Sequence, residues 1–248
     1  MAELYDAIGV GYDAYRRPDP RIAVAIGRTL GAAESVVNVG AGAGSYEPID
    51  RRVVAVEPSL AMIRQRRAGA APVVQASATD LPFGDGAFDA ALAILTVHHW
   101  PDRARGLAEL VRVARRRVVI VTWDPASSGF WLTEDYFPSI LTIDRPIFST
   151  MNELRQALGE IEVVPLPVPY DCVDGFLGAY WRRPHAYLEA GVRSAISTFS
   201  KLGDVGPGLD RLRRDLDDGT WMRRHGDLLD RSELDLGYRL VVARASRD

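Results

Sequence analysis

Residues 35–47 read SVVNVGAGAGSYE and contain the most informative turn of the chain. A short β-branched run is interrupted there by three glycines, Gly40, Gly42 and Gly44. Glycine adopts positive φ without strain and lets backbone N–H groups come close to a ligand, because it has no Cβ. The pattern therefore predicts a strand that ends in a ligand-binding turn.

Further apolar runs follow this turn. The next four are RRVVAVEP (51–58), APVVQA (71–76), FDAALAIL (88–95) and RRVVIVTW (116–123). Two later runs are EIEVVPLPVPYD (160–171), whose prolines are typical of an outer strand, and LGYRLVVAR (236–244). Near-continuous apolar runs of this length predict strands that are covered on both faces.

Helical patterns lie between these runs. One is SLAMIRQRR (59–67), for which Ser59 is the expected N-cap, and another is DRARGLAELVRVARR (102–116), for which Asp102 is the expected N-cap. Because strands and helices alternate, the sequence predicts a doubly wound α/β fold. Its Rossmann-like sheet is expected to be seven-stranded and mostly parallel.

The composition limits the classes of partner. The chain has 248 residues, of which 47% are hydrophobic and 25% charged, with a formal net charge of −3. This charge gives no reason to expect nucleic acid or an anionic membrane as a partner. No apolar run approaches the length of a membrane span. We expect a cytoplasmic monomer or homodimer that acts on a small molecule.

Cysteine and lysine each occur once. Cys172 alone excludes an intramolecular disulfide and a cysteine-rich metal site. The chain has four histidines, and we expect no metal. Lys201 is the single lysine among 30 basic residues, a bias that we attribute to genome composition and from which we draw no function.

The glycine turn and Glu57 together indicate an adenosine pocket. Ligands of open α/β sheets bind beyond the carboxyl ends of the strands, so the turn and Glu57, which ends the second run, meet at one edge. A carboxylate there can accept hydrogen bonds from both hydroxyls of a ribose. The glycine spacing is GxGxG, whereas the nicotinamide fingerprint is GxGxxG.

With these motifs the chain resembles the class I S-adenosylmethionine-dependent methyltransferases. The closest group is that of ubiquinone/menaquinone-biosynthesis-like and trans-aconitate-like small-molecule enzymes. The resemblance covers about residues 5–123 and rests on VVNVGAGAGSYE, VVAVEPSLAM and VVQASATDLPFGDGAFDAALAILTVHHWPD. It implies S-adenosyl-L-methionine as cofactor and methyl transfer to an O, N or C nucleophile of a small metabolite.

The resemblance also implies which residues bind the cofactor. They are Asn38, Gly40, Ala41, Gly42, Gly44, Glu57, Pro58, Ser59, Met62, Ser77, Ala78, Thr79 and Ile94, with Tyr12 and Arg17 in a segment that folds over the cofactor. The glycine turn wraps the methionyl part, and Glu57 takes the ribose diol. The family usually has an acid at the place of Asn38 and commonly an aspartate at that of Ser77, and both substitutes can still form hydrogen bonds.

The same resemblance divides the chain into functional parts. We expect a single methyltransferase domain over residues 1–248. Residues 1–30 would form an N-terminal helical lid, residues 31–124 the cofactor-binding core, and residues 170–230 a helical substrate cap inserted before the last strand.

The candidate catalytic residues follow the fourth and fifth strands. Adjacent residues of a strand face opposite sides, so at most one of His98 and His99 faces the site if the strand continues. His99 is the candidate base. Asp124 is a second candidate proton acceptor or substrate contact, and a turn-forming aspartate is the alternative. Methyl transfer is an in-line displacement, so a base is not obligatory.

The candidate substrate-binding residues are mainly aromatic. An aromatic wall with an arginine suits a planar or acidic small molecule, although core packing of the cap explains the same residues. The candidates are His98, Trp123, Tyr180, Trp181 and Arg182.

Two other functions share parts of this pattern. A non-methyltransferase that binds S-adenosylmethionine, for example a cyclase, would have the same motifs. An NAD-binding reductase is disfavoured by the glycine spacing.

Overall fold

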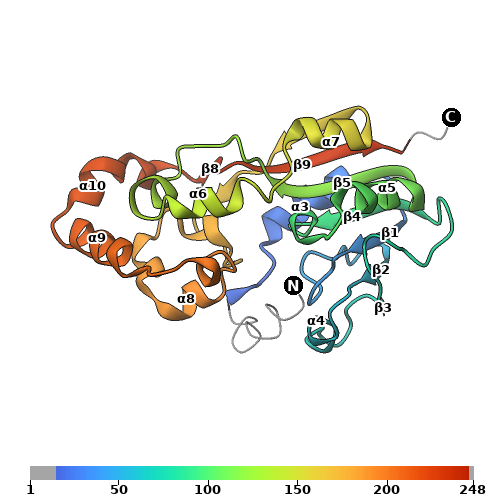
Figure 1. The fold of residues 1–248 in the computed structure, drawn as a ribbon, viewed down its shortest axis with the longest axis horizontal. Helices are drawn as coiled ribbons and strands as arrows, with labels where there is room; N and C mark the ends of the chain where they lie inside the picture. The colour runs from blue at the N-terminus through green and yellow to red at the C-terminus, as the bar shows by residue number, and fades with distance from the viewer. Residues whose placement is uncertain (1–14, 246–248) are drawn as a thin grey trace.

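The seven predicted strands form one sheet in the order β3-β2-β1-β4-β5-β9-β6 (Figure 1). The computed structural model describes residues 15–245. Only β9 runs against its neighbours β5 and β6, and the remaining pairs are parallel. The predicted doubly wound fold is therefore confirmed. The strands are β1 (Ser35–Val39), β2 (Arg52–Val56), β3 (Val73–Val74), β4 (Phe88–Ile94), β5 (Ala114–Trp123), β6 (Ile161–Pro165) and β9 (Tyr238–Arg244).

The helices beside the sheet begin where the sequence places polar caps. The Ser59 hydroxyl accepts the Met62 N–H at 3.3 Å, and the Asp102 carboxylate accepts the Arg105 N–H at 2.9 Å, as predicted. Within residues 15–245, no helix combines the length and apolarity needed to cross a bilayer. The helices are α3 (Pro20–Thr29), α4 (Leu60–Arg64), α5 (Arg103–Val113) and α7 (Met151–Leu158), with the single turn η1 (Val97–His99) after β4.

Both faces of the sheet carry an apolar layer. On one face, Ile22 and Ile26 of α3 and the following Leu30 pack with buried residues of β1, β4 and β5. On the other face, Leu110 of α5 and Leu154 of α7 join a second buried cluster. This double cover explains why the strands are apolar without alternation.

Between β5 and β9 the chain inserts β6 and a cap of short helices. In Figure 1, α8, α9 and α10 lie together at the end of the molecule away from β3. The segments are η2 (Leu132–Tyr136), α6 (Ser139–Asp144), η3 (Leu177–Tyr180), η4 (Pro184–Leu188), α8 (Ala190–Ser194), η5 (Phe199–Lys201), α9 (Gly206–Asp217), α10 (Thr220–His225) and η6 (Gly226–Asp230), with the two-stranded sheet β7 (Val168–Pro169) and β8 (Glu233–Leu234).

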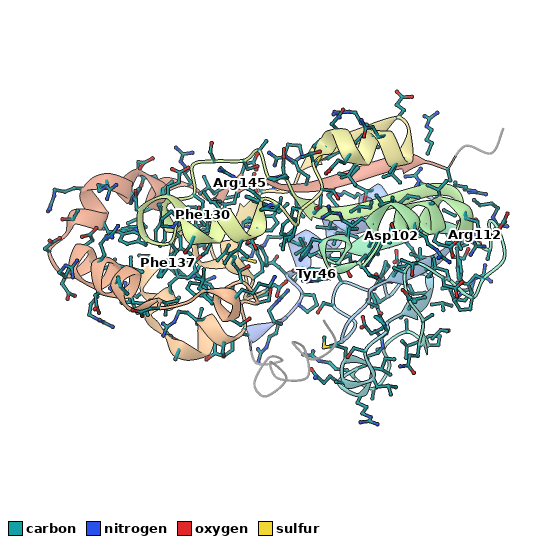
Figure 2. All side chains as sticks on the ribbon, in the orientation of Figure 1. Tyr46, Asp102, Arg112, Phe130, Phe137 and Arg145 are labelled. Atoms are coloured by element: carbon teal, nitrogen blue, oxygen red, sulfur yellow. The ribbon has the colours of Figure 1, made fainter. Side chains whose placement is uncertain are left out.

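Buried aromatic rings hold the cap together. The Trp131 ring meets Tyr187 and Trp221 edge-on, at centroid distances of 5.6 and 5.5 Å. The Trp131 indole N–H also donates to the Trp181 carbonyl at 2.8 Å. Figure 2 places Phe130 and Phe137 at the same end of the molecule. The cap therefore includes the segment that contains Trp131, in addition to the predicted residues 170–230.

Candidate functional site

A cavity of about 460 Å³ lies at the carboxyl ends of β1, β2 and β4, between the sheet and the cap. Its sheet side is lined by the glycine turn and Glu57, and its cap side by residues of α6, η3 and η5. The volume falls in the range of small-molecule sites, roughly 300–1,000 Å³. The edge of an open α/β sheet where strands end is the expected place for a ligand.

The carboxylate of Glu57 is fixed by backbone donors. Gly42 N–H donates to Oε2 at 2.8 Å, and Ser59 N–H donates to Oε1 at 2.9 Å. Glu57 is buried at the end of β2 and lines the cavity. Each carboxylate oxygen retains a further lone pair for a ligand hydroxyl.

Gly40 allows the turn to pass close to the loop after β4. Its φ is +71°, and a Cβ there would lie 2.1 Å from Oγ1 of Thr96. Both the conformation and the space therefore require glycine.

Asn38 presents a polar atom without a protein partner. The residue is 1% exposed and lines the cavity, and no hydrogen bond to its Oδ1 is found within the described residues. Buried acceptors are normally satisfied, so Oδ1 is a place where a ligand donor fits.

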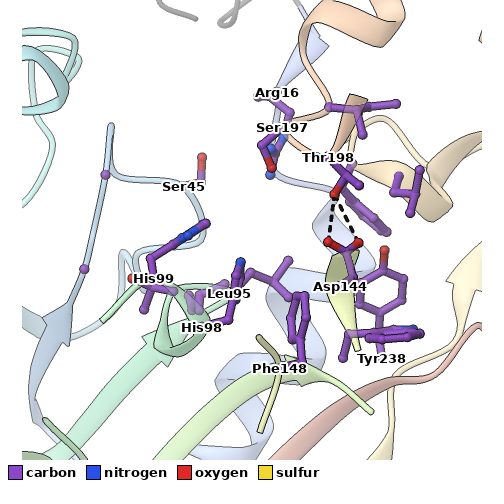
Figure 3. A pocket seen from close by; sticks show the side chains of 18 of the residues that line it. Arg16, Ser45, Leu95, His98, His99, Asp144, Phe148, Ser197, Thr198 and Tyr238 are labelled. Carbon is purple, nitrogen blue, oxygen red and sulfur yellow. Dashed lines mark hydrogen bonds between the residues drawn. The ribbon is translucent and has the colours of Figure 1, made fainter. Parts of the chain in front are cut away.

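His98 and His99 both line the cavity, because the strand does not continue through them. The strand ends at Ile94, Leu95 takes φ +47°, and the histidines lie on the turn η1. Because the alternation of a strand is lost, the two rings lie 3.9 Å apart between centroids. In Figure 3 they lie between Ser45, on the side of the glycine turn, and Asp144 of the cap.

Both histidines are held neutral at pH 7. Burial, with a smaller effect of the Lys201 charge, lowers the pKa of His99 from 6.5 to about 4. Burial also puts the pKa of His98 well below its ordinary value. The His98 ring stacks on Phe148 at a centroid distance of 4.0 Å. A neutral imidazole has one donor and one acceptor nitrogen.

Asp144 is a buried carboxyl group on the cap side. The Thr198 hydroxyl donates to it, at 3.1 Å from Oδ2 and 3.3 Å from Oδ1 (Figure 3). Burial raises the pKa of Asp144 above its ordinary value. Lys201, three residues after Thr198, lines the same side.

Comparison with known proteins gives the family. A model described as a methyltransferase domain matches residues 37–122. A solved structure from Anabaena variabilis ATCC 29413, assigned as a methyltransferase from an antibiotic biosynthesis pathway, is 33% identical with a TM-score of 0.85. That likeness covers 92% of this chain and 98% of the other. The chain belongs to the class I S-adenosylmethionine-dependent methyltransferases. The predicted family is thereby confirmed, and the NAD-binding reductase is set aside.

Curated relatives of this methyltransferase match over shorter stretches. The demethylmenaquinone methyltransferase of Corynebacterium kroppenstedtii is 29% identical over 136 residues, which are 46% of this chain and 55% of that protein. The chloroplastic tocopherol O-methyltransferase of Arabidopsis thaliana is 33% identical over 105 residues, 36% of this chain and 30% of that protein. The methyltransferase thus spans about half the length of the first relative and less than a third of the second.

Most of the predicted cofactor residues of the methyltransferase line one wall of the cavity. Gly44 and Thr79 lie behind this wall: Gly44 faces the side chains of Arg66 and Glu47, and the Thr79 hydroxyl lies 2.8 Å from that of Ser77. The residues on the wall are Asn38, Gly40, Ala41, Gly42, Glu57, Pro58, Ser59, Met62, Ser77, Ala78 and Ile94.

In the N-terminal segment, the arginine that lines the cavity is Arg16 and not the predicted Arg17. Tyr12 and residues 1–14 of the expected lid lie outside the described residues. Arg17 is exposed and is not part of the lining, because the chain pairs Arg16 with Asp174 in an isolated antiparallel bridge. Arg16 lines the cavity, and its Nε donates to Asp174 Oδ1 at 2.6 Å.

Asp124 forms a turn and does not line the cavity. Its N–H donates to the Gly237 carbonyl at 2.8 Å, and its carboxylate accepts the Ala126 N–H at 3.0 Å. The structure therefore corrects the prediction that Asp124 is a proton acceptor or substrate contact. Trp123, next to it, does line the cavity.

The predicted cap residues Tyr180, Trp181 and Arg182 also lie outside the lining. Trp181 is fully buried, and its indole N–H donates to the Val168 carbonyl at 3.0 Å. Tyr180 packs against Tyr187, and the Arg182 guanidinium lies 4.7 Å from the centre of the Tyr170 ring. These three residues stabilise the core and the surface of the cap, which is the alternative explanation given in the sequence analysis.

The residues that sequence reasoning missed line the cap side of the cavity. Asp144, Phe148 and Thr198 come from segments without a recognisable motif, and only long-range packing brings them together. The one local signal for this side is Lys201, the single lysine of the chain. Within residues 15–245, no group of three His, Cys, Asp or Glu side chains could hold a metal ion.

Proposed function

We propose that this methyltransferase transfers the methyl group of S-adenosylmethionine to an O, N or C nucleophile of a small-molecule acceptor. One observation carries the proposal. A single cavity joins the wall of predicted cofactor residues to an aromatic, cap-side wall, with two neutral histidines between them. The methyl donor and the methyl acceptor can therefore bind next to each other in this cavity.

The residues present suit S-adenosylmethionine, which when bound supplies an electrophilic methyl group. Glu57 has free lone pairs for the ribose hydroxyls, and Asn38 Oδ1 accepts from an ammonium donor such as the methionyl amine. The positive φ of Gly40 and its lack of a Cβ let the turn pass against Thr96 at the wall of the cavity. Burial of this wall strengthens each of these hydrogen bonds.

His99 has the properties of a general base in this proposal. It is neutral at pH 7 and lies between the two walls, so an imidazole nitrogen can take the proton of a hydroxyl or amine nucleophile. His98 and Phe148 form a stacked pair against which the acceptor packs. Positioning and exclusion of water supply the rest of the rate.

The scope of the proposal rests on charge and on the relatives. The names demethylmenaquinone methyltransferase and tocopherol O-methyltransferase denote small-molecule acceptors of those proteins. The net charge of −3 gives no reason for a nucleic-acid acceptor. A cytoplasmic monomer or homodimer is part of the same proposal.

Calorimetry with S-adenosylmethionine, S-adenosylhomocysteine and NAD tests the cofactor, and mass spectrometry of small-molecule products tests the transfer. We expect the first two ligands to bind at one site per chain and NAD not to bind. Binding of NAD alone would overturn the proposal. Conversion of an acceptor without formation of S-adenosylhomocysteine would instead identify the cyclase type of reaction.

A further inference from the structure

Lys201 stands out in both sequence and structure. Every other residue counted among the 30 basic ones is arginine. The single lysine ends η5 and lines the cap side of the cavity, where it is half-buried. Genome composition explains the excess of arginine, but it does not explain why the exception lies in the cavity.

The Lys201 ammonium forms no direct salt bridge with a described side chain. No hydrogen bond or ion pair within 4 Å is found for it within residues 15–245. The charge of Lys201 acts on the Asp144 carboxyl group, whose oxygens accept from the Thr198 hydroxyl. A half-buried cation is costly unless a charge or an acceptor compensates it.

The other groups that feel the Lys201 charge are neutral. This charge contributes to lowering the pKa of both His98 and His99, so Lys201 lies near the two histidines that line the same cavity. Neutral imidazoles cannot balance it. Lys201 is the cation that the segment η5 contributes to the cavity lining, which also holds Arg16 and the carboxyl groups of Glu57 and Asp144.

The cap side of the cavity carries aromatic rings in addition to the polar side chains of Asp144, Ser197 and Thr198. Phe148, Phe176 and Tyr238 line this side, and Phe148 is stacked on His98. Aromatic side chains favour flat rings as ligands. Lysine is a compact point charge, whereas the planar fork of arginine would occupy more of the space that a ring needs.

We propose that Lys201 selects the acceptor, by binding an anionic oxygen of an aromatic molecule that stacks in the cap side of the cavity. The sequence analysis placed such a wall at Trp181 and Arg182, and the structure moves it to Phe148, Tyr238 and Lys201. The inference rests on the proposed function and names its class of substrate. The anionic oxygen belongs to a carboxylate or to an ionised hydroxyl.

The test compares ligands that share one ring system and differ in charge. The probes are 2-naphthoate, 2-naphthalenemethanol and 2-naphthylmethylamine, titrated by calorimetry into protein saturated with S-adenosylhomocysteine. Charge-assisted hydrogen bonds contribute about 1.5–3 kcal/mol, so we expect 2-naphthoate to bind on the order of 10-fold or more tightly than the alcohol and the amine.

Three variants assign this preference to Lys201. Lys201→Met should abolish the preference for 2-naphthoate, and Lys201→Arg should retain part of it. Arg145→Met is the matched control, because Arg145 is an exposed cation directly after Asp144 and outside the cavity lining, so the preference should persist. A preference that persists in Lys201→Met, or its absence in the wild-type protein, would overturn the inference.

The single lysine also permits a direct spectroscopic test. Reductive methylation with ¹³C-formaldehyde labels only Lys201 and the terminal amine and keeps the positive charge. We expect the Lys201 resonance to shift with 2-naphthoate and not with the alcohol, while the terminal resonance stays unchanged. A Lys201 resonance that does not respond to 2-naphthoate would contradict direct contact.

The two sources of the anion are separated by pH. The charge of 2-naphthoate is constant near neutrality, whereas a phenol such as 2-naphthol ionises only toward pH 10. Tight carboxylate binding at neutral pH with weak naphthol binding throughout assigns the site to a carboxylate. Naphthol binding that strengthens more than 10-fold with rising pH assigns it to an ionised hydroxyl.

Loss of S-adenosylhomocysteine binding overturns the proposed function as well. If S-adenosylhomocysteine binds but the anionic probe is not preferred, only this inference is overturned.

Discussion

At the scale of single residues, Glu57 is the most direct test of the cofactor wall. Its carboxylate accepts two backbone N–H groups and faces the cavity. We expect Glu57→Ala to weaken S-adenosylhomocysteine binding by about 1.5–3 kcal/mol, because charge-assisted hydrogen bonds are lost. Calorimetry measures the change.

Two further variants interpret that result. Glu162→Ala removes an exposed carboxylate from the edge strand β6 and should leave the affinity unchanged. Glu57→Gln keeps the shape but exchanges an acceptor for a donor, so its affinity should be intermediate or lower. An unchanged affinity in Glu57→Ala, with a normal thermal transition, would remove Glu57 from the site.

Gly40 tests whether the glycine turn is required by space or only by conformation. Alanine at position 40 meets both a φ of +71° and Thr96 Oγ1 at 2.1 Å, whereas alanine at Gly69 meets φ +86° and nothing within 4 Å. Overpacking costs about 1–3 kcal/mol beyond the backbone strain. Gly40→Ala should therefore lower the free energy of unfolding by at least about 1 kcal/mol more than Gly69→Ala, measured in urea.

The same pair of variants can contradict this account. Equal losses of unfolding free energy would mean that the contact with Thr96 relaxes without cost. A double variant that adds Thr96→Ala to Gly40→Ala should recover the part of the loss that is due to the contact, but not the part due to φ.

At the scale of elements, the end of β4 shows why sequence reasoning stopped short of the site. The apolar run predicts the strand correctly, but period-two reasoning assumes that the strand continues through His98 and His99. The left-handed Leu95 and the turn η1 break that alternation. Leu95 is neither glycine nor asparagine, so no local signal announces the left-handed conformation.

The η1 turn also gives a prediction for acid stability. The pKa of His99 is about 4 in the fold and near its ordinary 6.5 when unfolded, so the unfolded chain binds the proton first. Stability is therefore lost as pH falls from about 6.5 toward 4, by up to about 3 kcal/mol from this group. His99→Gln should show a smaller loss of urea-unfolding free energy between pH 7 and pH 4.5 than the wild-type protein.

The surroundings of His99 explain why its pKa is lowered, and a second histidine provides the control. Burial disfavours the positive form of His99 most strongly, and the charge of Lys201 adds to this effect. His185→Gln, at an exposed histidine outside the cavity lining, should keep the wild-type pH dependence. If His99→Gln has the same slope as the wild-type protein, the imidazole titrates at its ordinary pKa in the fold.

At the scale of the whole molecule, the predictable part is the part with local patterns. The strands, the N-caps Ser59 and Asp102, and the cofactor wall follow from runs and motifs within about 90 residues. The acceptor wall depends on contacts such as Asp144 with Thr198, which are 54 residues apart, and on the aromatic core around Trp131. Spacing within a sequence carries no signal for such contacts, so the cap residues chosen for their chemistry proved to be packing residues.

One buried network joins the sheet side of the molecule to the cap. The carboxylate of Asp174, in the cap-side segment before η3, is 1% exposed and accepts from Arg16 Nε and from the Tyr46 hydroxyl, at 2.6 and 2.9 Å. Tyr46 follows the glycine turn, and its hydroxyl accepts the Asp19 N–H at 3.2 Å. Figure 2 shows Tyr46 between the cap and the sheet.

This network should set how firmly the cap is held over the cavity. Asp174→Ala removes the charge that pairs with Arg16 in a buried place and should cost about 3–5 kcal/mol of unfolding free energy. Tyr46→Phe removes one hydrogen bond and should cost about 1 kcal/mol. Urea unfolding of both variants and of the double variant measures the coupling between the two side chains.

The coupling decides whether the three segments act as one unit. If the network is cooperative, Tyr46→Phe costs little once Asp174 is alanine, because its acceptor is already gone, and the cycle shows a coupling of about 0.5–3 kcal/mol. Tyr170→Phe, at an exposed tyrosine of the same segment, should add independently. Strict additivity of Tyr46→Phe and Asp174→Ala would mean that the hydrogen bond between them does not hold the cap. The affinity for S-adenosylhomocysteine should then be unchanged in Asp174→Ala, whereas a cooperative network predicts that it weakens together with stability.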